Sequence, residues 1–185
     1  MLVTTDAIIL SLQPHSDKAH ILHAYTRTGG RVNYMVYGLG RKNTAGKYSP
    51  LSIVQLTTDE RSIRTAQLTF VPATIVADPY KQAIALFISE VLYHVLRHPM
   101  PDEPLFDFIA KRIETLDKTD HCENFHLDFM TGLSEKLGFG IPEVENVHTR
   151  AERQKALRNL CDYFEQHVET WENPKSLDIL MEVFD

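Results

Sequence analysis

The sequence has no run of 18 or more apolar residues, the length that a membrane-spanning helix requires. Its first residues, Met1 to Asp6, contain no basic stretch ahead of an apolar run, which argues against a signal peptide. Cysteine is scarce: Cys122 and Cys161 lie far apart, and we interpret them as thiols of a reducing compartment rather than as one disulfide. We therefore predict a soluble, cytoplasmic protein with no membrane partner.

Motifs for nucleotide binding and for catalysis are also missing. Gly38 and Gly40 resemble the start of a dinucleotide-binding fingerprint, but no third glycine and no amphipathic helix follow. No Gly-Lys-Ser/Thr phosphate loop and no Gly-x-Ser-x-Gly elbow occurs. Acidic pairs such as Asp59-Glu60 lie in exposed-looking turns, where solvation explains them better than acid–base catalysis. We predict a protein that is not an enzyme and needs no cofactor.

Nine histidines are present, but they do not form a complete set of metal ligands. His94 and His98 have the four-residue spacing of a helical ligand pair, yet no glutamate follows His94 as in the zincin motif. His121, Cys122 and His126 form a second, weak cluster. We predict that no metal is bound; a metal-dependent hydrolase using one of these clusters is the alternative.

Charge divides the chain unevenly. Residues 1–77 carry eight basic and four acidic side chains, a net charge of +4, whereas residues 78–185 carry a net charge of −10. Such a split predicts different partners for the two halves, and the basic half suits a polyanion.

Residues 1–77 have the pattern of short strands joined by polar turns. Apolar or alternating segments occur at 7–10, 21–26, 31–37, 52–58 and 63–71, and the glycine-bearing stretch 27–30 predicts a hairpin connection. In 31–37, Val32, Tyr34 and Val36 share one face, while Asn33, Met35 and Tyr37 lie on the other. Five short strands predict an OB-fold β-barrel, although a small sandwich or an SH3-like barrel fits the pattern nearly as well.

Helical periodicity begins at residue 78 and continues to the end of the printed sequence. Asp78 is suited to cap a helix that starts at Pro79 and stops before Pro99. Further helices are expected from about residue 104, from 124 to 137, around 157–168 and after Ser176, with residues 141–150 as an exposed link. The fold class is therefore α+β, with an OB-fold nucleic-acid-binding domain at 1–77 and an α-helical bundle domain at 78–185.

The loop from Tyr37 to Tyr48 is the strongest chemical feature. Its glycines allow a ligand to approach the backbone closely, and Arg41, Lys42 and Lys47 supply positive charge for phosphates. An outward-pointing Tyr37 is able to stack on an unpaired base. The alternative is a solvated loop with ordinary lysines.

Several segments, taken in order, resemble the RecO family of recombination mediators. They are the opening Thr5 to Leu10, the stretch from Ala24 to Arg31, the loop Tyr37 to Lys42, the strand Ser49 to Leu56, and the helical segments 78–87, 125–129 and 175–180. The match touches most of the chain, and its strength lies in the order and spacing of these segments.

The resemblance implies binding of single- and double-stranded DNA, strand annealing, and loading of a recombinase with a RecR-like protein and single-stranded DNA-binding protein. It also implies a cytoplasmic protein that is associated with the nucleoid. It assigns DNA binding to Arg27, Arg31, Arg41, Lys42 and Lys47, beside Tyr37. Many family members carry a four-cysteine zinc module, which this chain cannot supply. The alternative is a protein-interaction adaptor whose barrel has little DNA affinity of its own.

Overall fold

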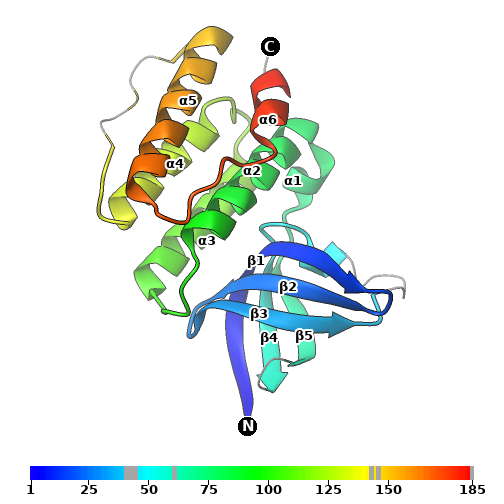
Figure 1. Cartoon of the computed structure of the whole chain (residues 1–185). Helices are drawn as coiled ribbons and strands as arrows, with labels where there is room; N and C mark the ends of the chain where they lie inside the picture. The colour runs from blue at the N-terminus through cyan, green and yellow to red at the C-terminus, as the bar shows by residue number, and fades with distance from the viewer. Residues whose placement is uncertain (40–45, 60–61, 142–143, 145–146, 184–185) are drawn as a thin grey trace. The chain divides into compact units, whose positions relative to one another are not determined.

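The computed structural model describes residues 1–39, 46–59, 62–141, 144 and 147–183. Within these residues, five strands precede the helices (Figure 1). The strands are β1 (Leu2–Ser16), β2 (Ala19–Thr26), β3 (Gly30–Tyr37), β4 (Ile53–Asp59) and β5 (Ser62–Phe70), with a 3₁₀-helix η1 (Gly46–Tyr48) ahead of β4. The predicted α+β fold class, with an OB-fold barrel followed by helices, is confirmed.

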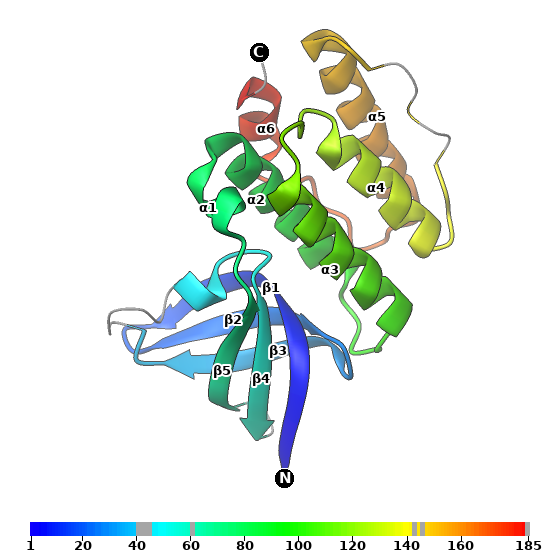
Figure 2. The ribbon, with the colours of Figure 1, turned by 180° about the vertical axis from the view of Figure 1, so that it is seen from behind.

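The strands form a closed barrel in the order β1-β2-β3-β5-β4, which is the OB-fold arrangement. Strand β1 pairs antiparallel with β2 and also with β4, and Figure 2 shows β1, β4 and β5 side by side. A register shift between Ile9 and Ser11 in the β1–β2 ladder allows this long strand to bend around the barrel. The closing contact is a parallel one between β3 and β5, where Met35 faces Ser62.

Alternation along the strands fills the barrel with apolar side chains. On β3, Tyr34 and Val36 are buried, and Val32 packs against the same core cluster. Asn33 is exposed on the opposite face, and Tyr37 is 66% exposed. The predicted division of β3 into an inner and an outer face is therefore confirmed. The inner face is completed by Ala7, Ile9, Leu22, Ala24, Tyr48, Val54 and Leu56.

The helices are α1 (Ala73–Ala77), α2 (Pro79–Val95), α3 (Glu103–Lys118), α4 (Phe125–Lys136), α5 (Arg150–His167) and α6 (Leu177–Val183). Asp78 caps α2 as predicted, because its carboxylate accepts a hydrogen bond from the Tyr80 amide at 2.8 Å. The short helix α1 was not expected from the sequence. Thr149 and Glu152 form a capping box that starts α5 seven residues earlier than its apolar repeat indicates.

None of the helices in the described part of the chain combines the length and apolar character that a membrane crossing requires.

Contacts divide the chain into two compact units. The first contains Met1–Pro72 together with Leu96–Ile113, and the second contains Ala73–Val95 together with Glu114–Asp185. The single boundary between residues 77 and 78 stays a prediction, and the division by contacts shows that the barrel unit also includes a later segment of the chain.

Two parts of this later segment lie against the barrel: a strap, which we define as residues 96–102, and the first half of α3. Gly30 shows why the strap fits. A Cβ atom at Gly30 would lie 2.4 Å from the Met100 carbonyl oxygen, and the residue has φ +64°, so glycine is required on both grounds. Beside it, the Tyr25 ring stacks on the Phe106 ring of α3 at a centroid distance of 6.2 Å.

The second unit is a helical core that encloses a histidine. Its fully buried side chains include Phe87 of α2, Phe129 of α4 and Phe164 of α5. His126 is 2% exposed and meets the Phe87 ring edge to face at 6.3 Å. Burial, assisted by the charge of Arg153, lowers the pKa of His126 to about 3, so the ring is neutral at physiological pH.

Candidate nucleic-acid interface

The outer face of the β2–β3 hairpin is open at one end and covered at the other. The register pairs Ile21 with Met35, His23 with Asn33, and Tyr25 with Arg31, so these six side chains share the outer face. Near the turn, Tyr25 is 2% exposed and Arg31 is 9% exposed. Near the other end, Ile21 and Met35 are half-buried and Tyr37 is exposed. A ligand therefore has access to the end that contains Tyr37.

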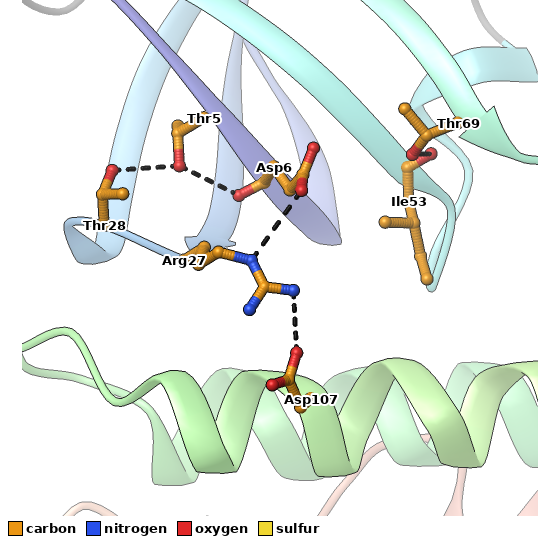
Figure 3. Close-up of polar contacts among 7 residues, drawn as sticks. All are labelled: Thr5, Asp6, Arg27, Thr28, Ile53, Thr69 and Asp107. Atoms are coloured by element: carbon orange, nitrogen blue, oxygen red, sulfur yellow. Dashed lines mark hydrogen bonds and ion pairs between the residues drawn. The ribbon is translucent and has the colours of Figure 1, made fainter.

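Arg27 lies at the covered end and is held by the chain itself (Figure 3). Its guanidinium is 2.7 Å from the Asp107 carboxylate of α3 and 3.8 Å from the Asp6 carboxylate of β1, and it lies 4.5 Å above the centre of the Phe106 ring. The hydrogen bond to Asp107 raises the pKa of Arg27, and the charges of Asp107, Asp6 and Glu103 act in the same direction. Three carboxylates around one arginine give a negative local charge, which disfavours a phosphate. The DNA contact that the resemblance assigns to Arg27 stays a prediction; in the structure its guanidinium joins α3 to the barrel.

Arg31 is also engaged inside the first unit. Its backbone amide donates to the His98 carbonyl at 3.2 Å, and its guanidinium donates to the Leu96 carbonyl at 3.3 Å and to Asn33 Oδ1 at 3.4 Å. With so little of its surface exposed, Arg31 is better explained as the anchor of the strap than as a direct phosphate contact.

Tyr37 is the predicted residue that is best placed for a ligand. It lines an open hollow with residues of the β1–β2 turn, of the start of β2 and of the loop after β3: Asp17, Lys18, His20, Gly38 and Leu39. The exposed Tyr37 ring offers a stacking surface and Lys18 offers a cation beside it, a combination that binds single-stranded nucleic acid, while the Asp17 carboxylate in the same hollow offsets part of that charge.

Lys47 lies in η1 and is partly committed to the fold. Its Nζ donates to the Ala66 carbonyl of β5 at 3.3 Å and lies 5.9 Å from the centre of the Tyr48 ring. Lys47 is nevertheless only half-buried, so part of the residue stays accessible to solvent. Arg41 and Lys42, the remaining predicted contacts, lie outside the described residues.

The four predicted residues that the structure describes do not converge on one spot. Arg27 and Arg31 flank the turn, whereas Tyr37 lies at the far end of the hairpin, opposite Ala19. The seven residue steps from Ala19 to Thr26 correspond to about 23 Å. A single small site cannot include both ends, so the open end is the better candidate.

His23 and Asn33 lie opposite one another at the centre of the face, between the two ends. His23 Nδ1 and Asn33 Oδ1 are hydrogen-bonded at 2.7 Å, and His23 is 7% exposed. Burial lowers the pKa of His23; the bond to Asn33 opposes this shift, and the charges of Arg31 and Arg97 lower it further. Two guanidinium groups therefore act on the centre of the outer face.

Lys18 and His20 were missed because they are distant from the glycine loop in sequence. The signal was nevertheless present: counting outward from the predicted 27–30 turn pairs Ala19 with Tyr37, which places Lys18 next to that ring.

The zinc module that the resemblance would imply does not fit this chain. Cys122 and Cys161 are free, buried thiols, and burial raises the pKa of both, that of Cys161 to about 12. Zinc needs thiolates or imidazoles gathered around one point. In the part of the chain that the structure describes, no three histidine, cysteine or acidic side chains come together in this way.

These features define the class of protein as one with an OB-fold barrel that presents an exposed aromatic ring beside basic side chains. Comparison with protein families agrees. The family model described as Recombination protein O N terminal matches residues 1–71, and the one described as Recombination protein O C terminal matches residues 76–152. The chain belongs to the RecO family of DNA repair proteins.

Relatives match over their whole length. The protein called DNA repair protein RecO from Porphyromonas gingivalis is 27% identical over 245 aligned positions, and that from Phocaeicola vulgatus is 29% identical over 240, with 100% of each chain covered. Because this chain has 185 residues, at least 60 positions of the 245-position alignment have no residue of this chain.

Proposed function

We propose that the chain is a non-enzymatic recombination mediator that binds DNA through the open end of the β2–β3 face. The observation that carries the proposal is Tyr37, 66% exposed and next to Lys18 and His20 in one hollow. An unpaired base stacks on the Tyr37 ring, while the lysine holds a neighbouring phosphate. Lys47 of η1, and Arg41 and Lys42 shortly before it in the sequence, are further basic residues for the proposed interface.

Local charge explains how an acidic protein binds a polyanion. The net charge of the whole chain is −6, and residues 78–185 account for more than all of it. Long-range attraction to DNA is therefore weak, and binding depends on the few basic groups of the barrel. Salt screens those contacts, so affinity falls as salt rises.

The proposed role is single- and double-stranded DNA binding, strand annealing, and loading of a recombinase with a RecR-like protein and single-stranded DNA-binding protein. Its support is the family membership of the chain, the names of its relatives as DNA repair proteins, and the hollow on the barrel. Such a role places the protein at the nucleoid, in the cytoplasm.

Fluorescence anisotropy with a labelled oligo-dT tests the proposal. Replacing Tyr37 with Ala removes a stacking partner worth about 1 to 3 kcal/mol per base, so affinity should fall roughly 5- to 150-fold. Duplex DNA should lose much less, because its bases are already stacked on one another.

Tyr80→Ala is the matched control. Tyr80 is 49% exposed on α2, in the other unit, so its loss should leave oligo-dT affinity unchanged. Equal affinities of wild type, Y37A and Y80A would move the site away from the hollow, and no binding by wild type at low salt would overturn DNA binding by the chain alone.

The second candidate function is a protein-interaction adaptor with little DNA affinity of its own. The engagement of Arg27 and Arg31 within the fold favours it, because it removes two of the predicted cationic contacts. A pull-down that retains RecR-like or single-stranded-DNA-binding partners after nuclease treatment would support the adaptor; loss of the partners with the DNA would count against it.

A further inference from the structure

The strap brings a cation to the β2–β3 face. Arg31 holds both carbonyl groups that flank Arg97, since its guanidinium donates to the Leu96 oxygen and its amide to the His98 oxygen. Both neighbours of Arg97 are therefore hydrogen-bonded to Arg31 of β3, and consecutive Cα atoms are only about 3.8 Å apart, so the Arg97 backbone is held close to β3. Its position on the face is therefore set by the fold.

Arg97 is exposed at this junction. Residues 97–100 are all exposed, whereas Arg31 beneath them is buried. The charge of Arg97 reaches the middle of the face, because it contributes to the lowered pKa of His23, whose main cause is burial. An exposed Asn33 lies between this point and the open end.

We propose that Arg97 is a second phosphate contact for a strand of DNA that lies along the outer face of β2–β3. The inference rests on the proposed function and deepens it, because it defines the course of the bound strand by a contact at each end of the face. At one end a base stacks on Tyr37 beside Lys18, and at the other a phosphate meets Arg97. Position 31 is six residues from Tyr37 along β3, a separation of about 20 Å.

This path makes the strap part of the binding surface. The covered half of the face does not bind bases, because the strap lies over it. The strap instead contributes the Arg97 guanidinium as a contact for phosphate. A path of about 20 Å suits a short strand, at the lower end of the roughly 4 to 16 nucleotides that OB-folds bind.

The test measures the salt dependence of oligo-dT binding by the full chain, carrying Arg97→Gln, between about 50 and 200 mM salt. Loss of one phosphate contact on a single strand should reduce the magnitude of the log–log slope by about 0.7. If the variant and the wild type bind equally at 1 M salt, this difference in slope makes the variant about eightfold weaker at 50 mM salt. Arg97→Lys, which keeps the charge, should retain the wild-type slope.

Arg64→Gln is the control, because it removes the same charge from β5, where Arg64 pairs with Asp59 at 3.1 Å. Since Arg97 is exposed, its replacement should leave the fold intact, which far-UV circular dichroism verifies. Equal slopes for R97Q and R64Q, with Y37A still weakened, would overturn the role of Arg97 and leave the proposed function standing. If Y37A also bound like wild type, the proposed function itself would fail.

Discussion

Mild acid should destabilise the helical unit through His126. This residue is 2% exposed, and its pKa lies at about 3 in the folded protein, against 6.5 for an ordinary histidine. Between these two values the unfolded chain binds a proton at this position and the folded chain does not. The free energy of unfolding therefore rises with pH across this window, and stability is lost as pH falls below 6.5.

The size of the effect follows from the same two values. Each pH unit within the window changes the free energy of unfolding by about 1.4 kcal/mol. At pH 5, which is 1.5 units below the unfolded value, His126 should cost about 2 kcal/mol relative to pH 8. This figure depends on the unfolded pKa alone as long as the folded value stays well below 5.

Urea unfolding at pH 5 and pH 8 measures the difference, and the fluorescence of Trp171, which is buried in the same unit, is the probe. His126→Gln cannot titrate, so it should lose about 2 kcal/mol less than wild type between the two pH values. His121→Gln, which replaces an exposed histidine, should behave like wild type. The buried His23 contributes with the same sign to all three proteins and cancels in the comparison. A pH dependence shared by H126Q and wild type would refute the reasoning.

Two further predictions concern the junction within the first unit. Arg27→Met should lower the free energy of unfolding by about 1 to 2 kcal/mol, the combined worth of a partly exposed ion pair with Asp107 and a cation–π contact, and it should leave oligo-dT affinity unchanged. A clear fall in affinity would return Arg27 to the DNA interface. Gly30→Ala should destabilise the chain more than Gly38→Ala in urea unfolding. Both residues have a positive φ, worth roughly 1 to 2 kcal/mol, but a Cβ atom meets the Met100 backbone at Gly30 and nothing within 4 Å at Gly38. Equal losses would mean that the strap moves aside freely.

Local chemistry made most elements of this fold predictable. The β2–β3 hairpin was visible because apolar alternation surrounds a glycine turn, and α2 was visible because Asp78 and Pro79 precede a three- and four-residue repeat. Helix α1 was missed because five residues are too few to show a period. The early start of α5 was missed for two reasons: its first two turns are largely polar and show no apolar repeat, and Thr149 was not recognised as the start of a capping box.

The site was harder to predict than the fold, because the sequence gives the number of charged residues but not the groups that bind them in the folded chain. Arg27 and Arg31 lie in a basic half, yet the groups that engage them, Asp107 and the Leu96 carbonyl, come from the later segment 96–113. No periodicity in residues 1–77 reveals such a partner. The outward direction of Tyr37 was predictable from strand parity, which is a local property. Its exposure was not, because Tyr25 and Arg31 share the outer face and are buried.

The discontinuity of the first unit has a consequence during synthesis. Its last residue, Ile113, follows Pro72 by 41 positions, so a ribosome completes all five strands well before it makes the segment that packs against them. At about 5 to 20 residues per second, the delay is roughly 2 to 8 s. During that interval the side chains of Tyr25 and Arg31 have no cover from α3 or the strap, and the nascent barrel presents an aromatic and cationic surface that the finished protein conceals.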